Sequence, residues 1–389
     1  MKPTLVILSA VSMAHAFAGM PDLLKNLPRG QDDVNIHKLP GDLEGQDDRK
    51  LSNTGSLIKR ILEGRENPED RTTSYTSVPG RNSAACRHDK CCIWKHIADE
   101  MRSKMVGGAG RCNNLARQAV RMGFHDAAAW SLNTGRGGGA DGSLVLAREC
   151  YNRKDNAGMK LGCDQMQAWY NKYRPYGISM ADLIQMGANV ATVVCPLGPR
   201  VRTFVGRRDS WKPAPQGLLP SAFDSADYLI SLFANKTISA NQLVALVGAH
   251  TTSQQFFVNG RRAGDPQDST PGVWDTKFYG ETTDPKSPRR VLKFQSDINL
   301  SKDARTRGAW AAFTGPAGQA PWNGAYAAAY VRMSLLGVYN TNDLTECTKA
   351  LPLPRPVYHA PDAPALAKFV NGGAPDAATN ASNGDIIVS

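Results

Sequence analysis

The sequence RMGFHDA, from Arg121 to Ala127, places a guanidinium and an imidazole four positions apart. If this stretch is helical, the side chains of Arg121 and His125 lie on one face, one turn apart. Arginine supplies a permanent cation with several hydrogen-bond donors, and histidine exchanges a proton near neutral pH. Taken alone, such a pair is more often a solvated surface pair than a catalytic one, so its meaning depends on the rest of the chain.

The same pair suits the cleavage of a peroxide bond. A base must take a proton from one oxygen and return it to the leaving oxygen. A fixed cation must stabilise the charge that develops as the bond breaks. His125 and Arg121 could fill these two roles, which leaves Asp126 free for another role.

Helical periodicity dominates residues 86–352, and the alternating pattern of a half-buried strand is nearly absent. Ser179 with Asp182, and Ser239 with Gln242, have the spacing of capping boxes at the start of apolar helical runs. The sequence therefore predicts a mostly α-helical domain with ordered loops.

The N-terminus predicts export. A basic start, an apolar run from Leu5 to Met13 and small residues up to Ala18 are typical of a signal peptide, which we place at 1–18. The run is too short to span a bilayer, and no later segment reaches the required length. We therefore expect a secreted, extracellular protein that does not interact with membranes.

Three further segments follow the signal peptide. Residues 19–80 are polar, with Tyr75 as their one aromatic side chain, so we expect a mostly disordered leader or propeptide, with Lys59-Arg60 as a candidate processing site. Residues 81–350 have the composition of a folded domain. Residues 351–389 form a Pro/Ala-rich tail that wraps the surface or stays mobile.

The formal net charge is +11, but no motif gathers Lys and Arg with interleaved aromatic residues, which argues against nucleic-acid binding. Asn235, Asn299 and Asn380 begin glycan acceptor sequons, whose occupancy the sequence does not decide. The composition is that of a basic, soluble, secreted domain.

The eight cysteines fit an oxidising compartment, and no C-x-x-C pair points to a metal site. Eight cysteines allow 105 pairings, so their spacing alone does not assign the disulfides.

The stretch Arg121-x-x-Phe124-His125-Asp126 resembles the distal motif of the plant, fungal and bacterial haem peroxidase superfamily. Residues 139–143 (Gly-Ala-Asp-Gly-Ser) resemble its distal calcium loop. Asn156-Ala-Gly-Met resembles the segment whose Asn orients the distal His, and Glu149 extends that network, although the spacing to Asn156 is one residue longer than usual.

Leu246-Val-Gly-Ala-His250-Thr251 resembles the proximal motif of the same superfamily. Alone, His250 would be read as a satisfied core histidine. The resemblance makes it the axial ligand of the haem iron, with Asp297 as the carboxylate that accepts its free N–H. Phe124 is then expected to contact the haem.

The resemblance implies one haem b and two calcium ions. Carboxylate, hydroxyl and carbonyl oxygens are the donors that calcium prefers. The implied ligands are Asp126, Gly139, Asp141 and Ser143 at the distal site, and Thr251, Asp268, Thr270, Val273 and Asp275 at the proximal site.

The resemblance covers roughly 86–350 and is strongest to fungal class II members. It implies an all-α fold of roughly ten main helices in two lobes, with haem sandwiched between them and with disulfides and calcium as stabilisers. It also implies the pairs Cys86–Cys92, Cys91–Cys347 and Cys112–Cys195. Gly308 stands where the usual fourth bridge has a cysteine, so we predict that Cys150 pairs with Cys163 around the Asn156 loop.

Several departures bear on the substrate. Manganese-oxidising members carry carboxylates where this chain has Asn114, Gln118 and Phe256, and we predict no such manganese site. Ala245 replaces the exposed redox tryptophan of lignin and versatile peroxidases. Gln267 stands where many members have an aromatic ring beneath the haem, and the sequence offers no reason for it.

The leading hypothesis is a secreted, monomeric haem peroxidase. It would use hydrogen peroxide to oxidise phenolic or similar small donors in one-electron steps through a ferryl/radical intermediate. The alternatives are a manganese- or lignin-oxidising specialist with a relocated site, and a non-catalytic secreted calcium-binding or adhesion protein. A non-catalytic protein of this kind is expected to have lost Arg121, His125 or His250. All three are present, which argues against this alternative.

Overall fold

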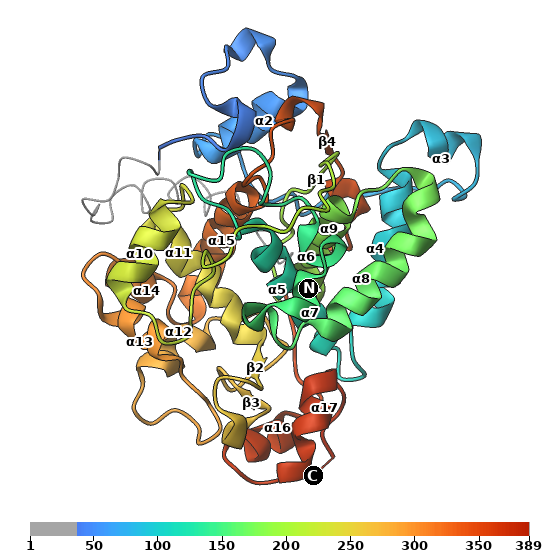
Figure 1. Ribbon diagram of the computed structural model, residues 1–389. Coiled ribbons are helices and arrows are strands. Elements are labelled where there is room, and N and C mark those ends of the chain that lie inside the picture. Colours follow the sequence, from blue (N-terminus) through green and yellow to red (C-terminus); the bar gives the residue numbers. More distant parts are fainter. Residues whose placement is uncertain (1–36, 389) are drawn as a thin grey trace, which may run out of the picture.

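A helix that is buried on every side, α9 (Met180–Val194), lies inside the fold (Figure 1). Eleven of its 15 residues are apolar, and its four polar side chains, Asp182, Gln185, Asn189 and Thr192, are buried and hydrogen-bonded inside the protein. The helix must therefore be enclosed by other elements. Helices α4 (Cys92–Met105) and α5 (Asn114–Ala127) pack against it. The computed structural model describes residues 37–388, and all statements below refer to these residues.

Gly123 allows α5 to approach α9 closely. A Cβ atom at this position would stand 2.6 Å from the Cβ of Ala188 and 2.2 Å from the Oη of Tyr330. Gln185 of α9 donates a hydrogen bond of 3.1 Å to the Gly123 carbonyl. These contacts fix which face of α5 points away from α9.

Helices α4 to α9 form one group and α10 to α14 another, with α15 between them (Figure 1). The remaining α-helices are α2 (Asn53–Leu62), α3 (Ala84–His88), α6 (Ser143–Leu146), α7 (Glu149–Asn152), α8 (Lys160–Tyr173), α10 (Ala226–Ala234), α11 (Ala240–Val247), α12 (Lys277–Thr283), α13 (Gln295–Lys302), α14 (Arg307–Ala312), α15 (Gln319–Met333), α16 (Ala363–Val370) and α17 (Ala378–Asn383).

Sheet structure is limited to two short antiparallel pairs among the described residues. β1 (Phe204–Val205) pairs with β4 (Thr345–Glu346), with Phe204 opposite Glu346. β2 (Gln254–Gln255) pairs with β3 (Asp265–Pro266), with Gln254 opposite Pro266. The prediction of an all-α fold class is confirmed.

Both predicted helix starts carry their caps, with one difference. At α11, Ser239 and Gln242 form the complete capping box. At α9, the Ser179 hydroxyl accepts from the backbone N–H of Asp182 at 3.1 Å, but the Asp182 carboxylate does not return to the cap. It forms a buried ion pair of 2.9 Å with Arg207. A buried guanidinium without an anionic partner is strongly destabilising, so the carboxylate of Asp182 pairs with Arg207 and does not cap the helix.

Four disulfides join the eight cysteines: Cys86–Cys92, Cys91–Cys347, Cys112–Cys195 and Cys150–Cys163. They are the expected pairs, including the one around the Asn156 loop. Cys112 precedes α5 and Cys195 follows α9, so this bridge joins the two helices that pack most extensively on each other.

The segment 37–80 differs from the disordered leader that the sequence predicts. It contains α2, and Leu43, Ile58 and Ile61 are buried in the main core. The low average hydrophobicity of the segment hides the helical spacing of its few apolar residues. Residues 19–36 and the predicted signal peptide lie outside the described residues.

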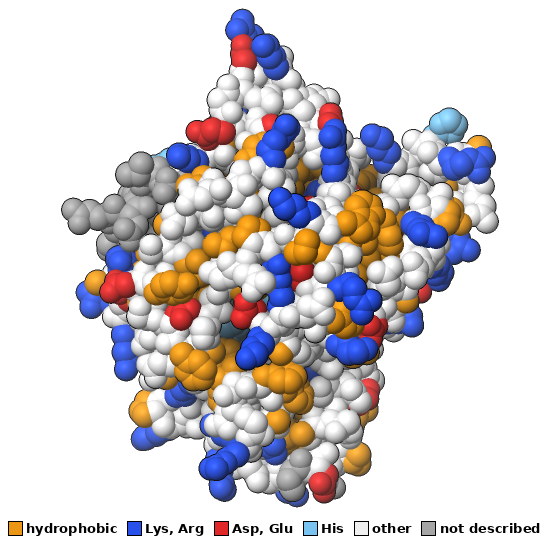
Figure 2. Space-filling view, in the orientation of Figure 1, with side chains coloured by type: hydrophobic (Ala, Val, Ile, Leu, Met, Phe, Trp, Pro, Cys, Tyr) orange, Lys and Arg blue, Asp and Glu red, His pale blue; other side chains and the backbone are white. Residues whose placement is uncertain are grey.

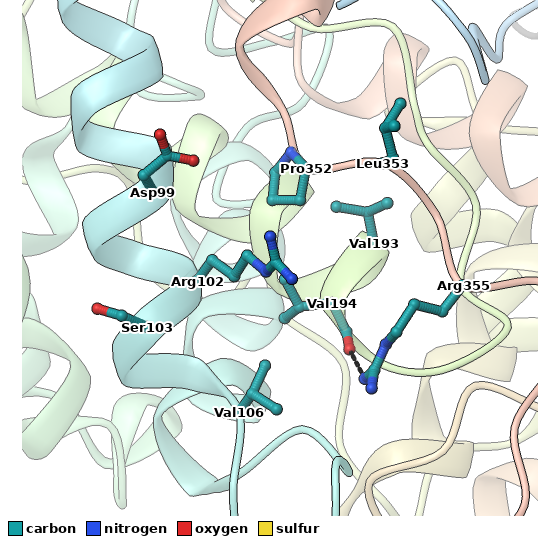
Figure 3. A pocket seen from close by; sticks show the side chains of 9 residues that line it. All are labelled: Asp99, Arg102, Ser103, Val106, Val193, Val194, Pro352, Leu353 and Arg355. Atoms are coloured by element: carbon teal, nitrogen blue, oxygen red, sulfur yellow. Dashed lines mark hydrogen bonds between the residues drawn. The ribbon is translucent and has the colours of Figure 1, made fainter.

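The tail after residue 351 is ordered and forms a small core of its own around α16 and α17, at the bottom of Figure 1. A buried bidentate ion pair between Arg111 and Asp362, at 2.6 and 2.7 Å, fastens it to the main domain. Further back along the tail, Pro352, Leu353 and Arg355 line a surface pocket of about 480 Å³ together with α4 and the end of α9 (Figure 3).

No single described helix is long and apolar enough to cross a membrane. Only α8 with the following turn (Lys160–Tyr176), joined to α9 through a bend of 119°, reaches the required length.

We predict that the 37–80 segment stabilises the folded domain. Ile58→Ala should lower the free energy of unfolding by about 2–5 kcal/mol, because it leaves a cavity beneath α2. Thermal denaturation would measure the change, with the exposed Asn53→Ala as a control that leaves the midpoint unchanged. Equal midpoints for Ile58→Ala and the parent would contradict the prediction.

Candidate active site

Arg121 and His125 lie on the face of α5 that points away from α9. The Nε atom of Arg121 donates to Nε2 of His125 at 3.2 Å. The other two guanidinium nitrogens donate to the backbone carbonyls of Ala157 at 2.7 Å and Asp155 at 2.9 Å. The cation is thus held over the imidazole by backbone groups that do not titrate.

Asn156 orients the imidazole from its other side. Its Oδ1 lies 2.8 Å from Nδ1 of His125, and its amide donates to the Glu149 carbonyl at 3.1 Å. Because an amide oxygen only accepts, Nδ1 carries the proton and Nε2 keeps its lone pair. His125 is therefore arranged to act as a base through Nε2.

Glu149 takes part in this network through its backbone and not through its carboxylate. The carboxylate pairs with Arg153 at 2.7 Å and accepts from the Ala214 N–H at 2.8 Å. The disulfide between Cys150 and Cys163 spans the same loop.

Burial keeps the imidazole neutral. Burial, together with the charge of Arg121, lowers the pKa of His125 to about 3, and the Asn156 hydrogen bond opposes this shift. Burial also lowers the pKa of Arg121 to about 10, so the guanidinium stays charged at neutral pH. The base and the cation thus coexist over a wide pH range.

His250 lies in the 3₁₀ turn Gly248–Thr252 that directly follows α11. Its Nδ1 is 3.2 Å from Oδ2 of Asp297, which lies in the first turn of α13. The rings of Phe278 and Phe294 contact the imidazole edge to face, at 5.7 and 5.5 Å between centroids. These contacts fix the ring and leave Nε2 without a partner among the described residues.

The surroundings of His250 fit the haem that the sequence implies. Its side chain is 35% exposed although that of Asp297 is 1% exposed, so the free Nε2 edge faces open space. The face shown in Figure 2 is hollowed near its centre, and a histidine is visible at the bottom of the hollow. Phe124, half-buried on α5, stacks on Phe233 at 6.1 Å.

Two buried donors add to this fit. Nη1 of Arg117 and Nε2 of Gln267 are buried and have no hydrogen-bond partner among the described residues. Gln267 is held against the proximal turn, because its Oε1 accepts from the Ser253 hydroxyl. A ligand with acceptor groups would satisfy such donors.

The predicted distal calcium ligands converge behind His125. Asp126 accepts from the N–H groups of Gly142 at 3.0 Å and Leu144 at 3.2 Å, and Asp141 accepts from that of Ser143 at 3.1 Å. Burial, and the charge of Asp141, raise the pKa of Asp126 well above its usual value. The carbonyl of Gly139 accepts from the Asp141 N–H at 2.7 Å.

The predicted proximal ligands converge in the same way next to His250. The hydroxyl of Thr251 contacts the Asp268 carboxylate and lies 3.4 Å from the Val273 carbonyl. The Thr270 hydroxyl lies 2.9 Å from Asp275. Burial raises the pKa of Asp268, and the neighbouring Asp275 adds to this effect. Carboxylate, hydroxyl and carbonyl oxygens gathered in this way are donors of the kind that a hard divalent cation prefers.

The positions of the manganese ligands in other members hold no carboxylate. The Gln118 amide donates to Asn114 at 3.3 Å and its Oε1 accepts from Gly162, while Phe256 is partly exposed. Ala245, at the position of the redox tryptophan, is fully buried in α11.

The sequence analysis did not identify two backbone carbonyls of the site or a further arginine next to it. The carbonyls of Asp155 and Ala157 carry no side-chain signature, so only the fold reveals that they anchor Arg121. Arg117 lies one turn before Arg121 on the same helix, and this spacing was a usable signal.

A protein-family model described as Peroxidase matches residues 97–315, which include His125 and His250. Manganese peroxidase 3 of Phlebia radiata is 31% identical over 68% of this chain and 77% of its own length. A peroxidase of Arthromyces ramosus is 30% identical over 71% and 79%. Versatile peroxidase VPS1 of Pleurotus eryngii is 28% identical over 77% and 85%.

The charge of Arg121 generates a prediction about pH. Arg121→Gln should raise the pKa of His125 above about 3, because it removes a neighbouring positive charge. The pKa of a histidine in the unfolded chain is about 6.5. Between this pH and the pKa of His125 in the folded chain, only the unfolded chain binds the proton, so the stability of the fold decreases as the pH falls. Arg121→Gln should narrow the pH range over which this loss of stability occurs.

NMR titration of isotope-labelled histidine rings would measure this pKa. Arg153→Gln is the matched control, because Arg153 pairs with Glu149 and does not act on His125. An unchanged or lower pKa in Arg121→Gln would contradict the assignment of the two side chains to one electrostatic unit.

Proposed function

This chain belongs to the peroxidase family, and from that premise we propose that it is a secreted haem peroxidase that oxidises small phenolic donors with hydrogen peroxide. One observation carries the proposal. A neutral, oriented imidazole with a fixed guanidinium lies on α5, and a second imidazole with a buried carboxylate partner lies on the turn after α11.

His125 would move the proton. Its Nε2 lone pair takes a proton from one peroxide oxygen and returns it to the leaving oxygen. The Asn156 oxygen holds the Nδ1 proton in place, so the reactive nitrogen is always Nε2. Arg121 lies beside that nitrogen and stabilises the negative charge that develops on the departing oxygen.

His250 would hold the haem through its free Nε2. When bound, the haem supplies the redox chemistry that no side chain of the site provides. Asp297 accepts the Nδ1 proton of His250, which orients the ring and makes it a stronger donor.

Two calcium ions would stabilise the positions of the two histidines. Asp126 directly follows His125, and Thr251 directly follows His250. A cation at each oxygen cluster would therefore fix the backbone next to each imidazole. Its charge would also offset the repulsion between the buried carboxylates.

The donors are proposed to be phenols or similar small molecules. No carboxylate occupies positions 114, 118 and 256, so a manganese ion has no anionic ligand among these three side chains. Ala245 offers no redox-active ring. Neither the manganese-oxidising nor the tryptophan-mediated specialist gains support from these positions.

The proposal is tested by the absorption spectrum of the purified protein before and after addition of peroxide. The parent should show a Soret band that shifts with peroxide. His125→Ala should keep the band and react about 10²–10⁴-fold more slowly in stopped-flow measurements, because the general base is lost. Absence of a Soret band in the parent, or an unchanged rate in the variant, would refute the proposal.

Calcium removal should destabilise the protein. Chelation is expected to lower the thermal midpoint of the parent, and added calcium should restore it. Asp268→Ala should start from a lower midpoint and respond less to chelation, because one buried ligand is gone. The exposed Asp376→Asn serves as the control, and a parent insensitive to chelators would count against both sites.

A further inference from the structure

Helix α5 carries a second buried guanidinium, that of Arg117, which the mechanism above does not use. The residue is 7% exposed. Its Nη2 donates to the backbone carbonyl of Ser382 at 2.7 Å and to the Ser382 hydroxyl at 3.0 Å. Its Nη1 is buried and has no partner among the residues that the structure describes.

Two other buried arginines of this chain are paired closely with carboxylates. Arg111, just before α5, makes a bidentate pair with Asp362, and Arg207 pairs with Asp182. Arg117 has none: burial lowers its pKa to about 9, and no carboxylate opposes that effect. A buried guanidinium left in this state is costly, so its persistence calls for an anionic partner.

The position of Arg117 indicates which partner. Its acceptor, Ser382, lies on α17. The same helix contacts the hairpin of β2 and β3, since a Cβ at Gly264 would stand 3.6 Å from the Cβ of Ala378. This hairpin begins four residues after His250. Arg117 therefore lies where the helix of His125 and the segment that follows His250 are brought together.

We propose that Nη1 of Arg117 binds a propionate carboxylate of the haem. This inference rests on the proposed function, and it assigns to the cofactor the anion that the chain itself does not supply. A guanidinium–carboxylate contact of this kind is charge-assisted and is stronger when buried. Arg117 then holds the periphery of the haem, while His250 holds the iron.

The same assignment gives a physical reason for the absence of manganese ligands. Asn114 and Gln118 flank Arg117 on α5, at positions where other members have carboxylates. A buried guanidinium between these positions repels a divalent cation and attracts a carboxylate. The charge of this edge of the site is thus reversed.

The test compares haem b with its dimethyl ester, in which both propionates are neutral. The full-length protein is reconstituted with each, and the dissociation constant is obtained from Soret titration and from the rate of haem transfer to a scavenger. The parent should bind haem b more tightly. Arg117→Gln should reduce that preference roughly tenfold to hundredfold, because a hydrogen bond to a charged group is lost. The affinity for haem b should fall, and the affinity for the dimethyl ester should stay the same.

Arg117→Lys should retain part of the preference, because it keeps a cation. It also covers the case in which the glutamine variant folds poorly, as judged by circular dichroism. Arg332→Gln is the matched control. Arg332 is another buried arginine with an unpaired nitrogen, but it donates to the carbonyl of Lys38 in the N-terminal segment. It should keep the preference of the parent.

An equal preference in Arg117→Gln and the parent would overturn the inference, even with a normal Soret band and normal peroxide reactivity. A second result would also overturn it: acetate stabilises the haem-free parent but not Arg117→Gln, while both proteins show the same preference for haem b over its dimethyl ester. Arg117 would then bind a free carboxylate and not a propionate of the haem. A parent that binds neither haem would overturn the proposed function as well.

Discussion

The enclosure of α9 is the constraint from which the active site follows. A helix whose polar side chains are all bonded inside the protein must be covered on all sides, and α5 covers one of them at the close approach that Gly123 permits. Once that face of α5 is committed, its opposite face, which carries Arg121 and His125, points away from α9. The disulfide between Cys112 and Cys195 holds the two helices in this relation.

The two imidazoles differ in what they are allowed to do, although both are oriented through Nδ1. His125 faces an amide oxygen, which carries no charge and leaves the ring a weak base. His250 faces a carboxylate, which makes it a stronger electron donor. In the proposed mechanism, a neutral partner suits a group that must release its proton again, and an anionic partner suits a group that would stay bound to the haem.

Much of this site was accessible from sequence because it consists of short motifs on single elements. Arg121 with His125, and His250 with Thr251, are neighbours along the chain, and the loops around Asp141 and Asp268 each contain most of their own oxygen donors. The order of residues 37–80 was not accessible, because α2 packs against distant parts of the chain, α15 and the turn at 341–343. The role of the Glu149 carbonyl was hidden for another reason: backbone groups leave no mark in the sequence.

The attachment of the tail has a consequence for how the protein is made. Arg111 stands just before α5, yet its carboxylate partner, Asp362, comes 251 residues later, and the acceptors of Arg117 come later still, at Ser382. During synthesis the distal helix must therefore exist for a long time with two guanidinium groups in need of partners. The region around α5 reaches its final form only after Asp362 and Ser382 have been synthesised. A chain that stops before Asp362 would contain every motif of the active site and still lack the contacts that bury these charges.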